Sequence, residues 1–200
     1  MKKFLLFTLA LLPLYVTAQQ FHGGIIAGIN GSQVDGDHFA GYNKLGFMAG
    51  FFVYRPVSER LDLQLEIKYM GKGAAKKTTK TDLSKYKSQL HYVEMPVLLH
   101  YKFSEKFGGE AGLGFGYLFS CAEKDEYGKI PDEAAVDFKP FELSSIIGFR
   151  YNVKPQLTVV LRYSYSILPI LGSPGDITYF FKRGAYNNLF SLGVMYELGK

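Results

Sequence analysis

Residues 61–69 alternate strictly between apolar and polar side chains. Leucine, isoleucine and tyrosine occupy every odd position, while aspartate, glutamine, glutamate and lysine occupy the even positions. This period of two puts the two kinds of side chain on opposite faces of a β-strand, because successive side chains of a strand point to opposite sides. An amphipathic helix would instead repeat its apolar positions every three or four residues. The stretch therefore predicts a strand that separates an apolar medium from a polar one.

The same alternation recurs along the chain and predicts eight strands. Their expected ranges are 21–30, 45–54, 61–71, 90–103, 107–120, 141–151, 157–167 and 189–198.

The connections between these strands alternate in length. Three are short turns, at 55–60, 104–106 and 152–156, and four have at least fourteen residues, at 31–44, 72–89, 121–140 and 168–188. Because consecutive strands of a meander run in opposite directions, every short turn falls at one end and every long loop at the other. This layout is typical of outer-membrane barrels.

A lipid bilayer explains the apolar face better than the core of a soluble barrel such as a lipocalin. The polar face is rich in glycine and serine, which fit the crowded interior of an eight-stranded barrel. The strands are long enough to cross the hydrocarbon when tilted, and their apolar face has no charge over its central stretch. We therefore expect an all-β fold, an eight-stranded antiparallel up-and-down transmembrane β-barrel.

Aromatic residues of the apolar face lie toward both predicted ends, where girdles at the two membrane interfaces would be expected. They are Phe51, Tyr101, Phe103, Phe107, Tyr151 and Tyr196 at the short-turn end, and Tyr69, Tyr117, Phe119, Phe141 and Tyr165 at the long-loop end.

Residues 1–18 predict a secretory signal peptide. Lys2 and Lys3 precede an apolar run, and small residues end the segment at Ala18. We expect cleavage after Ala18, export to the cell outer membrane, and a barrel formed by residues 19–200; an uncleaved anchor is the alternative. No later stretch is apolar for the 18 or more residues that a transmembrane helix needs.

Composition supports a barrel and excludes some function classes. The chain has 17 Phe, 15 Tyr and 22 Gly, which suits β-structure, and a single Cys, which excludes an internal disulfide. The net charge of +5 is small and dispersed, so nucleic acid is not an expected partner.

Charged side chains collect on the predicted inward face. One interpretation is a polar channel or an acid–base site, and the other is a network of ion pairs that plugs the barrel. Buried charges persist only when they are paired, so we expect the plug and no open pore. The residues of this polar lumen network are Glu66, Lys68, Glu94, His100, Lys102, Glu110, Glu142, Arg150 and Arg162.

Two long loops carry opposite charge. Loop 121–140 is mainly acidic, and loop 72–89 is strongly basic. The two loops could attract each other or bind charged sugars or a protein partner at the surface, or they could simply be solvated. The external basic loop contains Lys72, Lys76, Lys77, Lys80, Lys85 and Lys87.

Evidence for catalysis is weak. The four histidines lack metal-ligand spacing, and no nucleophile elbow, zinc-protease or phosphate-loop motif occurs. A lipid-modifying enzyme would need a Ser–His–acid set, for which only His91 with Ser88 offers a candidate pair. We expect a non-enzymatic protein with no catalytic residues, no metal and no cofactor.

Several segments resemble the PorT-like outer-membrane β-barrel family of Bacteroidota. They are the glycine-rich segment 23–30, Leu-Glu-Ile-Lys-Tyr at 65–69 followed by Gly-Lys-Gly at 71–73, and the segments 92–99, 112–116 and 161–165. The most specific is Tyr-x-Glu-x-Pro at 92–96. The resemblance implies a porin-like, eight-stranded outer-membrane barrel with a bulge at Pro96. It implies no single activity, although the family's namesake is linked to type IX protein secretion.

We therefore expect a monomeric barrel with a structural, binding or secretion-accessory role carried by its long external loops. A small porin or ligand-binding barrel is the alternative, and a lipid-modifying enzyme is a weaker one. The expected partners are outer-membrane lipid and lipopolysaccharide, the barrel-assembly machinery, and a protein at the external loops.

Overall fold

The computed structural model describes residues 21–36, 41–76, 78, 84–131, 135–171, 178–179 and 182–199. The predicted signal peptide lies outside these residues. The described strands are β1 (His22–Asp35), β2 (Lys44–Pro56), β3 (Leu61–Lys72), β4 (Tyr86–Lys102), β5 (Phe107–Asp125), β6 (Gly128–Lys129), β7 (Phe141–Lys154), β8 (Leu157–Ser166), β9 (Thr178–Tyr179), β10 (Lys182–Arg183) and β11 (Tyr186–Leu198).

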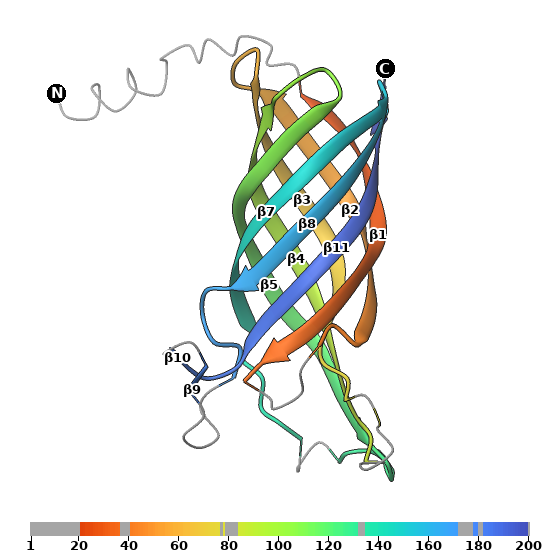
Figure 1. Ribbon diagram of the computed structural model, residues 1–200, viewed down its shortest axis with the longest axis vertical. Coiled ribbons are helices and arrows are strands. Elements are labelled where there is room, and N and C mark those ends of the chain that lie inside the picture. The colour runs from red at the N-terminus through yellow and green to blue at the C-terminus, as the bar shows by residue number, and fades with distance from the viewer. Residues whose placement is uncertain are drawn as a thin grey trace, which may run out of the picture.

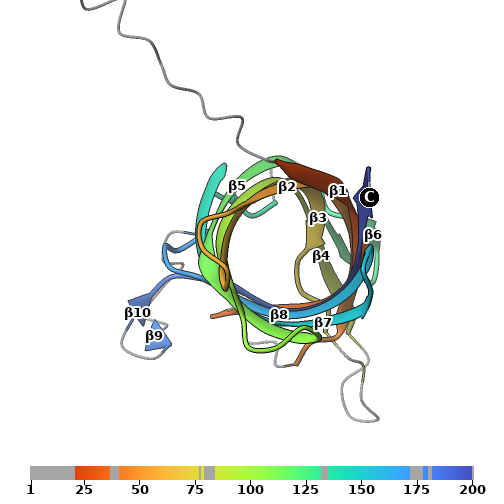
Figure 2. The same cartoon turned by 90° about the horizontal axis from the view of Figure 1, so that it is seen from above.

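Eight long strands form a closed antiparallel barrel. Each pairs with its neighbours in the order β1-β2-β3-β4-β5-β7-β8-β11, and β11 returns to pair with β1. Seen from above, the strands enclose a circular cross-section (Figure 2). The short β6 pairs with the end of β5, and β9 and β10 form a separate two-stranded hairpin. The predicted fold class is confirmed.

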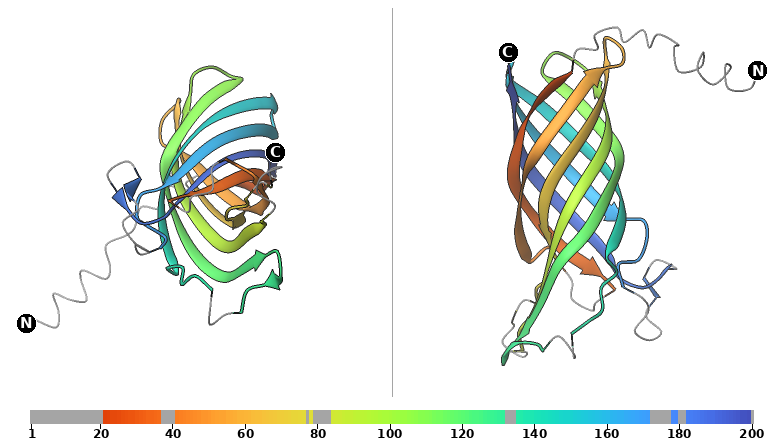
Figure 3. Two further views of the ribbon diagram at one scale, coloured as in Figure 1. Left: turned by 60° about the horizontal axis from the view of Figure 1, so that its bottom comes forward. Right: turned by 180° about the vertical axis from the view of Figure 1, so that it is seen from behind.

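The strands reach farther toward the long loops than the sequence suggested. β1 continues to Asp35, β4 begins at Tyr86 and β5 continues to Asp125. The paired ends of β4 and β5 extend past the barrel rim as an arm, while the short turns and the C-terminus lie at the opposite end (Figures 1 and 3). Most side chains on this arm are polar on both faces, so their alternation no longer marks a strand, although the backbone ladder continues.

Alternating side chains point into and out of the barrel. On β3, Gln64, Glu66 and Lys68 are buried, whereas Leu65 and Ile67 are 47% and 52% exposed. Large exposed hydrophobic side chains occur on all eight barrel strands. A continuous apolar belt of this kind matches a lipid-facing surface. Among the described residues, no helix is long and apolar enough to cross a membrane.

Aromatic side chains contact one another near both ends of the belt. At the short-turn end, the ring centroids of Phe107 and Tyr151 are 5.1 Å apart. At the long-loop end, the Tyr69 ring lies 4.7 Å from Phe47 and 6.3 Å from Phe119. These contacts have the positions expected of interfacial girdles.

Pro96 on β4 does not cause the expected bulge. The register between β3 and β4 is the same on both sides of this residue, and pairing is missing only at the two positions of β3 occupied by Glu66 and Ile67. Proline has no N–H to donate, which accounts for the interruption. The register shift of β4 lies against β5, between His91 and Tyr92. The predicted bulge at Pro96 is therefore wrong.

One side of the lumen is apolar, which the sequence analysis did not anticipate. The inward positions of β1, β2, β8 and β11 carry large hydrophobic side chains that pack together. The charged residues therefore occupy only part of the lumen. The principal members are Ile26, Met48, Phe52, Val160 and Met195.

If the apolar belt faces lipid, a charged side chain on it should lower the stability of the barrel, and more so near the middle of the membrane. Leu192, at the middle of β11, is 49% exposed, and Leu192→Arg should lower the free energy of unfolding by about 2–4 kcal/mol if it faces hydrocarbon. Val153→Arg, near the short-turn end of β7, should cost only about 0–1 kcal/mol. Denaturant unfolding in phospholipid vesicles measures both values. Equal costs at the two positions would contradict the lipid assignment.

Candidate functional site in the barrel lumen

Arg162 on β8 is the centre of an ion-pair network that crosses the lumen. Its guanidinium donates two hydrogen bonds to the Glu66 carboxylate on β3, at 2.8 and 2.7 Å. The same guanidinium donates to Glu110 on β5, which also accepts a 2.6 Å hydrogen bond from Arg150 on β7. These four side chains join four strands of the barrel wall.

Two lysines of β3 continue the network toward the long-loop end. The Lys68 ammonium lies 2.8 Å from a Glu66 oxygen and 3.6 Å from a Glu94 oxygen. The Lys72 ammonium lies 2.9 Å from Glu94 and 3.1 Å from Glu142. Each lysine therefore bridges two carboxylates.

Neutral groups complete the last pair of the network. The Glu142 carboxylate accepts hydrogen bonds from the Ser166 hydroxyl at 2.6 Å and from the Asn187 amide at 2.9 Å. The Lys72 ammonium also lies 5.0 Å from the centre of the Tyr92 ring, within cation–π range. Glu142, the outermost carboxylate, therefore has several hydrogen-bonding partners although it is buried away from water.

The network is a linear alternation of four cations and four carboxylates, which we name the charge chain. Every member is buried, so each charge depends on its neighbours for compensation. The balance of charge leaves no member of the chain without an opposite partner. In order, the members are Arg150, Glu110, Arg162, Glu66, Lys68, Glu94, Lys72 and Glu142.

Glycines on the neighbouring wall make room for these long side chains. A Cβ at Gly148 would lie 2.8 Å from a Glu110 oxygen and 3.0 Å from the Arg162 Cγ. A Cβ at Gly114 would lie 2.7 Å from the Ser144 hydroxyl oxygen. The small residues of the inward face therefore leave the space that the charge chain fills.

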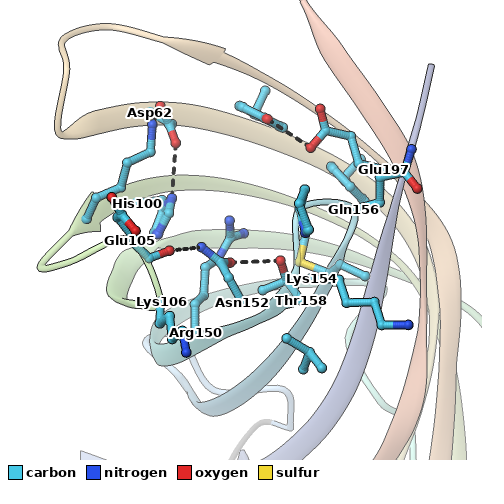
Figure 4. A pocket seen from close by; sticks show the side chains of 16 residues that line it. Asp62, His100, Glu105, Lys106, Arg150, Asn152, Lys154, Gln156, Thr158 and Glu197 are labelled. Atoms are coloured by element: carbon cyan, nitrogen blue, oxygen red, sulfur yellow. Dashed lines mark hydrogen bonds and ion pairs between the residues drawn. The ribbon is translucent and has the colours of Figure 1, made fainter. Parts of the chain in front are cut away.

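A second charged group lies at the short-turn mouth of the barrel. Asp62 accepts a 2.7 Å hydrogen bond from Lys102. The Asp62 carboxylate also lies 3.1 Å from the His100 Nδ1 (Figure 4). Nearby, the Asn152 amide donates to the Glu105 carbonyl (Figure 4). These groups border a hollow of about 480 Å³, whose wall includes Tyr54, Asp62, His100, Lys102, Arg150 and Glu197.

The predicted lumen residues divide between these two groups. Seven of them are in the charge chain, and the other two, His100 and Lys102, lie at the mouth with Asp62. The seven are Glu66, Lys68, Glu94, Glu110, Glu142, Arg150 and Arg162.

Lys72 corrects the prediction for the external basic loop. It was expected in the loop, but it ends β3 with its side chain buried and paired in the lumen. Lys76 and Lys85 follow β3 and precede β4 at the long-loop end, and Lys87 is on β4. Lys77 and Lys80 lie outside the described residues.

Sequence reasoning overlooked several partners of the charge chain. Lys72 was assigned to the loop, although the inward even-numbered positions that begin at Asp62 reach it without a break. Gln64 shares this register; it donates to Glu66 at 2.6 Å and accepts from Arg150 at 2.6 Å. Ser166 and Asn187, by contrast, have no distinguishing sequence signal.

The candidate catalytic pair is not brought together. Ser88 is buried, and its hydroxyl accepts a hydrogen bond from the Ala74 amide. The His91 ring lies on the opposite face of β4, with its Nδ1 2.6 Å from the Tyr69 hydroxyl. The structure thus gives no support to a Ser–His arrangement at these positions.

Comparison with solved structures supports the barrel fold. Ail, the attachment invasion locus protein of Yersinia pestis, matches with a TM-score of 0.54 and 14% identity, over 90% of this chain and 99% of Ail. Neisserial surface protein A matches with a TM-score of 0.52 and 11% identity, over 88% of this chain and 96% of that protein. At these identities, the likeness concerns the fold alone.

Sequence comparison identifies the family. No curated protein matches the chain. The family model described as the outer membrane protein beta-barrel domain matches residues 17–172, which is more than half of the chain. Since this domain is found in outer-membrane proteins, the match also supports the expected location. The chain therefore belongs to the family of outer membrane protein beta-barrel domains.

Proposed function

We propose that the protein is a closed, non-enzymatic outer-membrane barrel whose role is carried by its long-loop end. The observation that supports this proposal is the charge chain, whose paired charges cross the lumen beside the apolar cluster of Ile26, Met48 and Phe52. An eight-stranded barrel has an interior only wide enough for side chains, so a chain that crosses it leaves little room for water. The lumen then serves to hold the wall together, and contacts with other molecules belong to the loops.

Pairing of the charges favours a structural lumen over a transport path. A conducting pore needs charged groups that exchange partners with passing ions, whereas here each carboxylate of the charge chain already contacts two cations or a cation and neutral donors. Separating one pair would leave a buried charge uncompensated, which costs several kcal/mol. The charge chain therefore resists opening.

The long-loop end is suited to a binding role. The arm formed by β4 and β5 stands beyond the rim, where it is accessible to partners (Figure 3). The PorT-like resemblance extends this proposal to a secretion-accessory role for a monomeric barrel, with a protein partner at this end. Deletion of the gene followed by analysis of secreted proteins tests that extension, and unchanged secretion would overturn it.

A ligand-binding barrel is the second candidate, supported by the hollow at the short-turn mouth. Its volume of about 480 Å³ falls in the range of small-molecule pockets. Its wall carries both signs of charge, on Asp62, Lys102 and Arg150, so a zwitterionic or doubly charged solute would fit best.

Conductance tests the closed lumen. In planar bilayers, the purified barrel should give no stable conductance steps, because the charge chain and the apolar side chains beside it occupy the lumen. A general porin prepared in the same detergent is the positive control. Reproducible large steps from the barrel alone would overturn the closed-lumen proposal in favour of a small porin.

Removal of one charge tests the structural role of the charge chain. Glu110→Gln leaves Arg150 and Arg162 with one carboxylate fewer, and should lower the free energy of unfolding in vesicles by about 3–5 kcal/mol. Glu105→Gln, at an exposed turn position, is the control and should change it by no more than about 0.5 kcal/mol.

A double variant separates charge balance from simple loss of contacts. Glu110→Gln combined with Arg150→Gln restores neutrality, and should be less destabilising than the sum of the two single changes. Additive costs would show that the two side chains act independently and would contradict the proposed coupling.

A further inference from the structure

Lysines form a row across three strands of the arm. Lys87 on β4 is directly opposite Lys124 on β5, and Lys124 is directly opposite Lys129 on β6. Lys85 lies two residues before Lys87, just ahead of β4, and both lysines line the same hollow. All four side chains are exposed. We name Lys85, Lys87, Lys124 and Lys129 the lysine row.

This arrangement is unfavourable by itself. Like charges directly opposite each other on adjacent strands repel and destabilise the sheet. Lys87 is also close enough to Lys44, at the start of β2, for the two charges to repel each other. A site that gathers cations in this way gains free energy when an anion joins them.

The acidic residues of the arm already have other partners. Glu123 is buried, where its carboxylate accepts hydrogen bonds from the Tyr86 hydroxyl and from the Val136 amide. The Asp125 carboxylate accepts from the amides of Tyr127 and Gly128, which closes the tip of the hairpin.

Of the acidic residues described on the arm, this leaves Glu126, which is exposed at the tip. Among the described residues, no ion pair joins a carboxylate to Lys85, Lys87 or Lys124. Among the residues that the structure describes, these three side chains therefore have no ion-pair partner.

The lysine row continues the lipid-facing surface beyond the aromatic girdle. Lys87 shares the outward face of β4 with His91, which lies against the girdle residues Tyr69 and Phe119. Lys87 precedes His91 by four positions, which is about 13 Å along the strand. The lysines thus lie just outside the apolar belt, at the level of the polar headgroups.

A hollow beside the lysine row gives an anion room to bind. It has a volume of about 570 Å³, and four lysines contribute to its wall against a single aspartate. Its charged residues are Lys76, Lys85, Lys87, Lys124 and Asp125.

We propose that the lysine row binds the phosphate groups of phosphorylated glycolipid in the outer leaflet of the outer membrane. Lysine ammonium groups bind phosphate as point charges, and several of them on one face can share a single headgroup. The position of the row beside the lipid-facing belt favours an anion that is itself anchored in the bilayer. The proposal rests on the proposed function in one respect, namely that the long loops face the cell exterior.

Native mass spectrometry of the full barrel in detergent micelles tests the proposal by titration with diphosphorylated lipid A. The test variant carries Lys85→Gln, Lys87→Gln and Lys124→Gln. The control carries Arg60→Gln, Lys106→Gln and Lys154→Gln, which remove the same charge from exposed positions at the short-turn end. The test variant should bind lipid A at least about tenfold more weakly than the unaltered protein, and the control should bind it normally.

Three further measurements distinguish a lipid-anchored anion from a soluble one. Lipid A without phosphates should bind the unaltered protein weakly, inorganic phosphate at matched concentration should not displace lipid A, and added salt should weaken binding. Unchanged binding by the test variant, equal loss in the control, or equal binding of phosphate-free lipid would each overturn the proposal. Displacement by inorganic phosphate would also overturn it, because it would indicate a site for soluble anions.

Two controls keep the result interpretable. Heat-modifiable migration in gels verifies that each variant is a folded barrel, and none of the substituted residues belongs to the charge chain, so folding should be retained. Conductance is measured on the same samples. A barrel that conducts but binds lipid A normally would overturn the closed lumen and leave the lysine row in place.

Discussion

Closure of the hydrogen-bond ladder is the constraint on which the rest of the structure depends. Hydrocarbon offers no partner to backbone N–H and C=O groups, so a sheet in lipid must pair its last strand with its first. The pairing of β11 with β1 meets this requirement. Closure with only eight strands produces a narrow interior, and every even-numbered side chain of β3 must then find its partners inside it. The alternating sequence and the charge chain both follow from this geometry.

The sequence was sufficient to predict the strands that lie in the membrane. Lipid on one side and the lumen on the other impose a period of two on their side chains. Where the medium is the same on both sides, that signal disappears. The arm of β4 and β5 has mostly polar side chains on both faces, so its length could not be predicted. Lys72 lies at the end of the alternating pattern. It continues the inward register that begins at Asp62, but the expected strand ended at residue 71 and left Lys72 in the loop.

The identities of the ion pairs could not be predicted from the sequence. Contacts across a lumen depend on the stagger between strands, which a linear pattern does not specify. Arg162 could have met any inward carboxylate; its bidentate contact with Glu66 requires the register of the closed barrel. The apolar side of the lumen was missed for a different reason. Met48 and Phe52 share an inward register that was expected to be polar.

The contact between Arg162 and Glu66 has a consequence for assembly. These residues are 96 positions apart and lie on β8 and β3, which are not neighbours in the sheet. They can meet only after the sheet has curled, so an open intermediate in the bilayer would hold their charges without compensation. The charge chain therefore destabilises partly assembled sheets relative to the closed barrel. In this sense it acts as a checkpoint for barrel closure, in addition to its contribution to the finished fold.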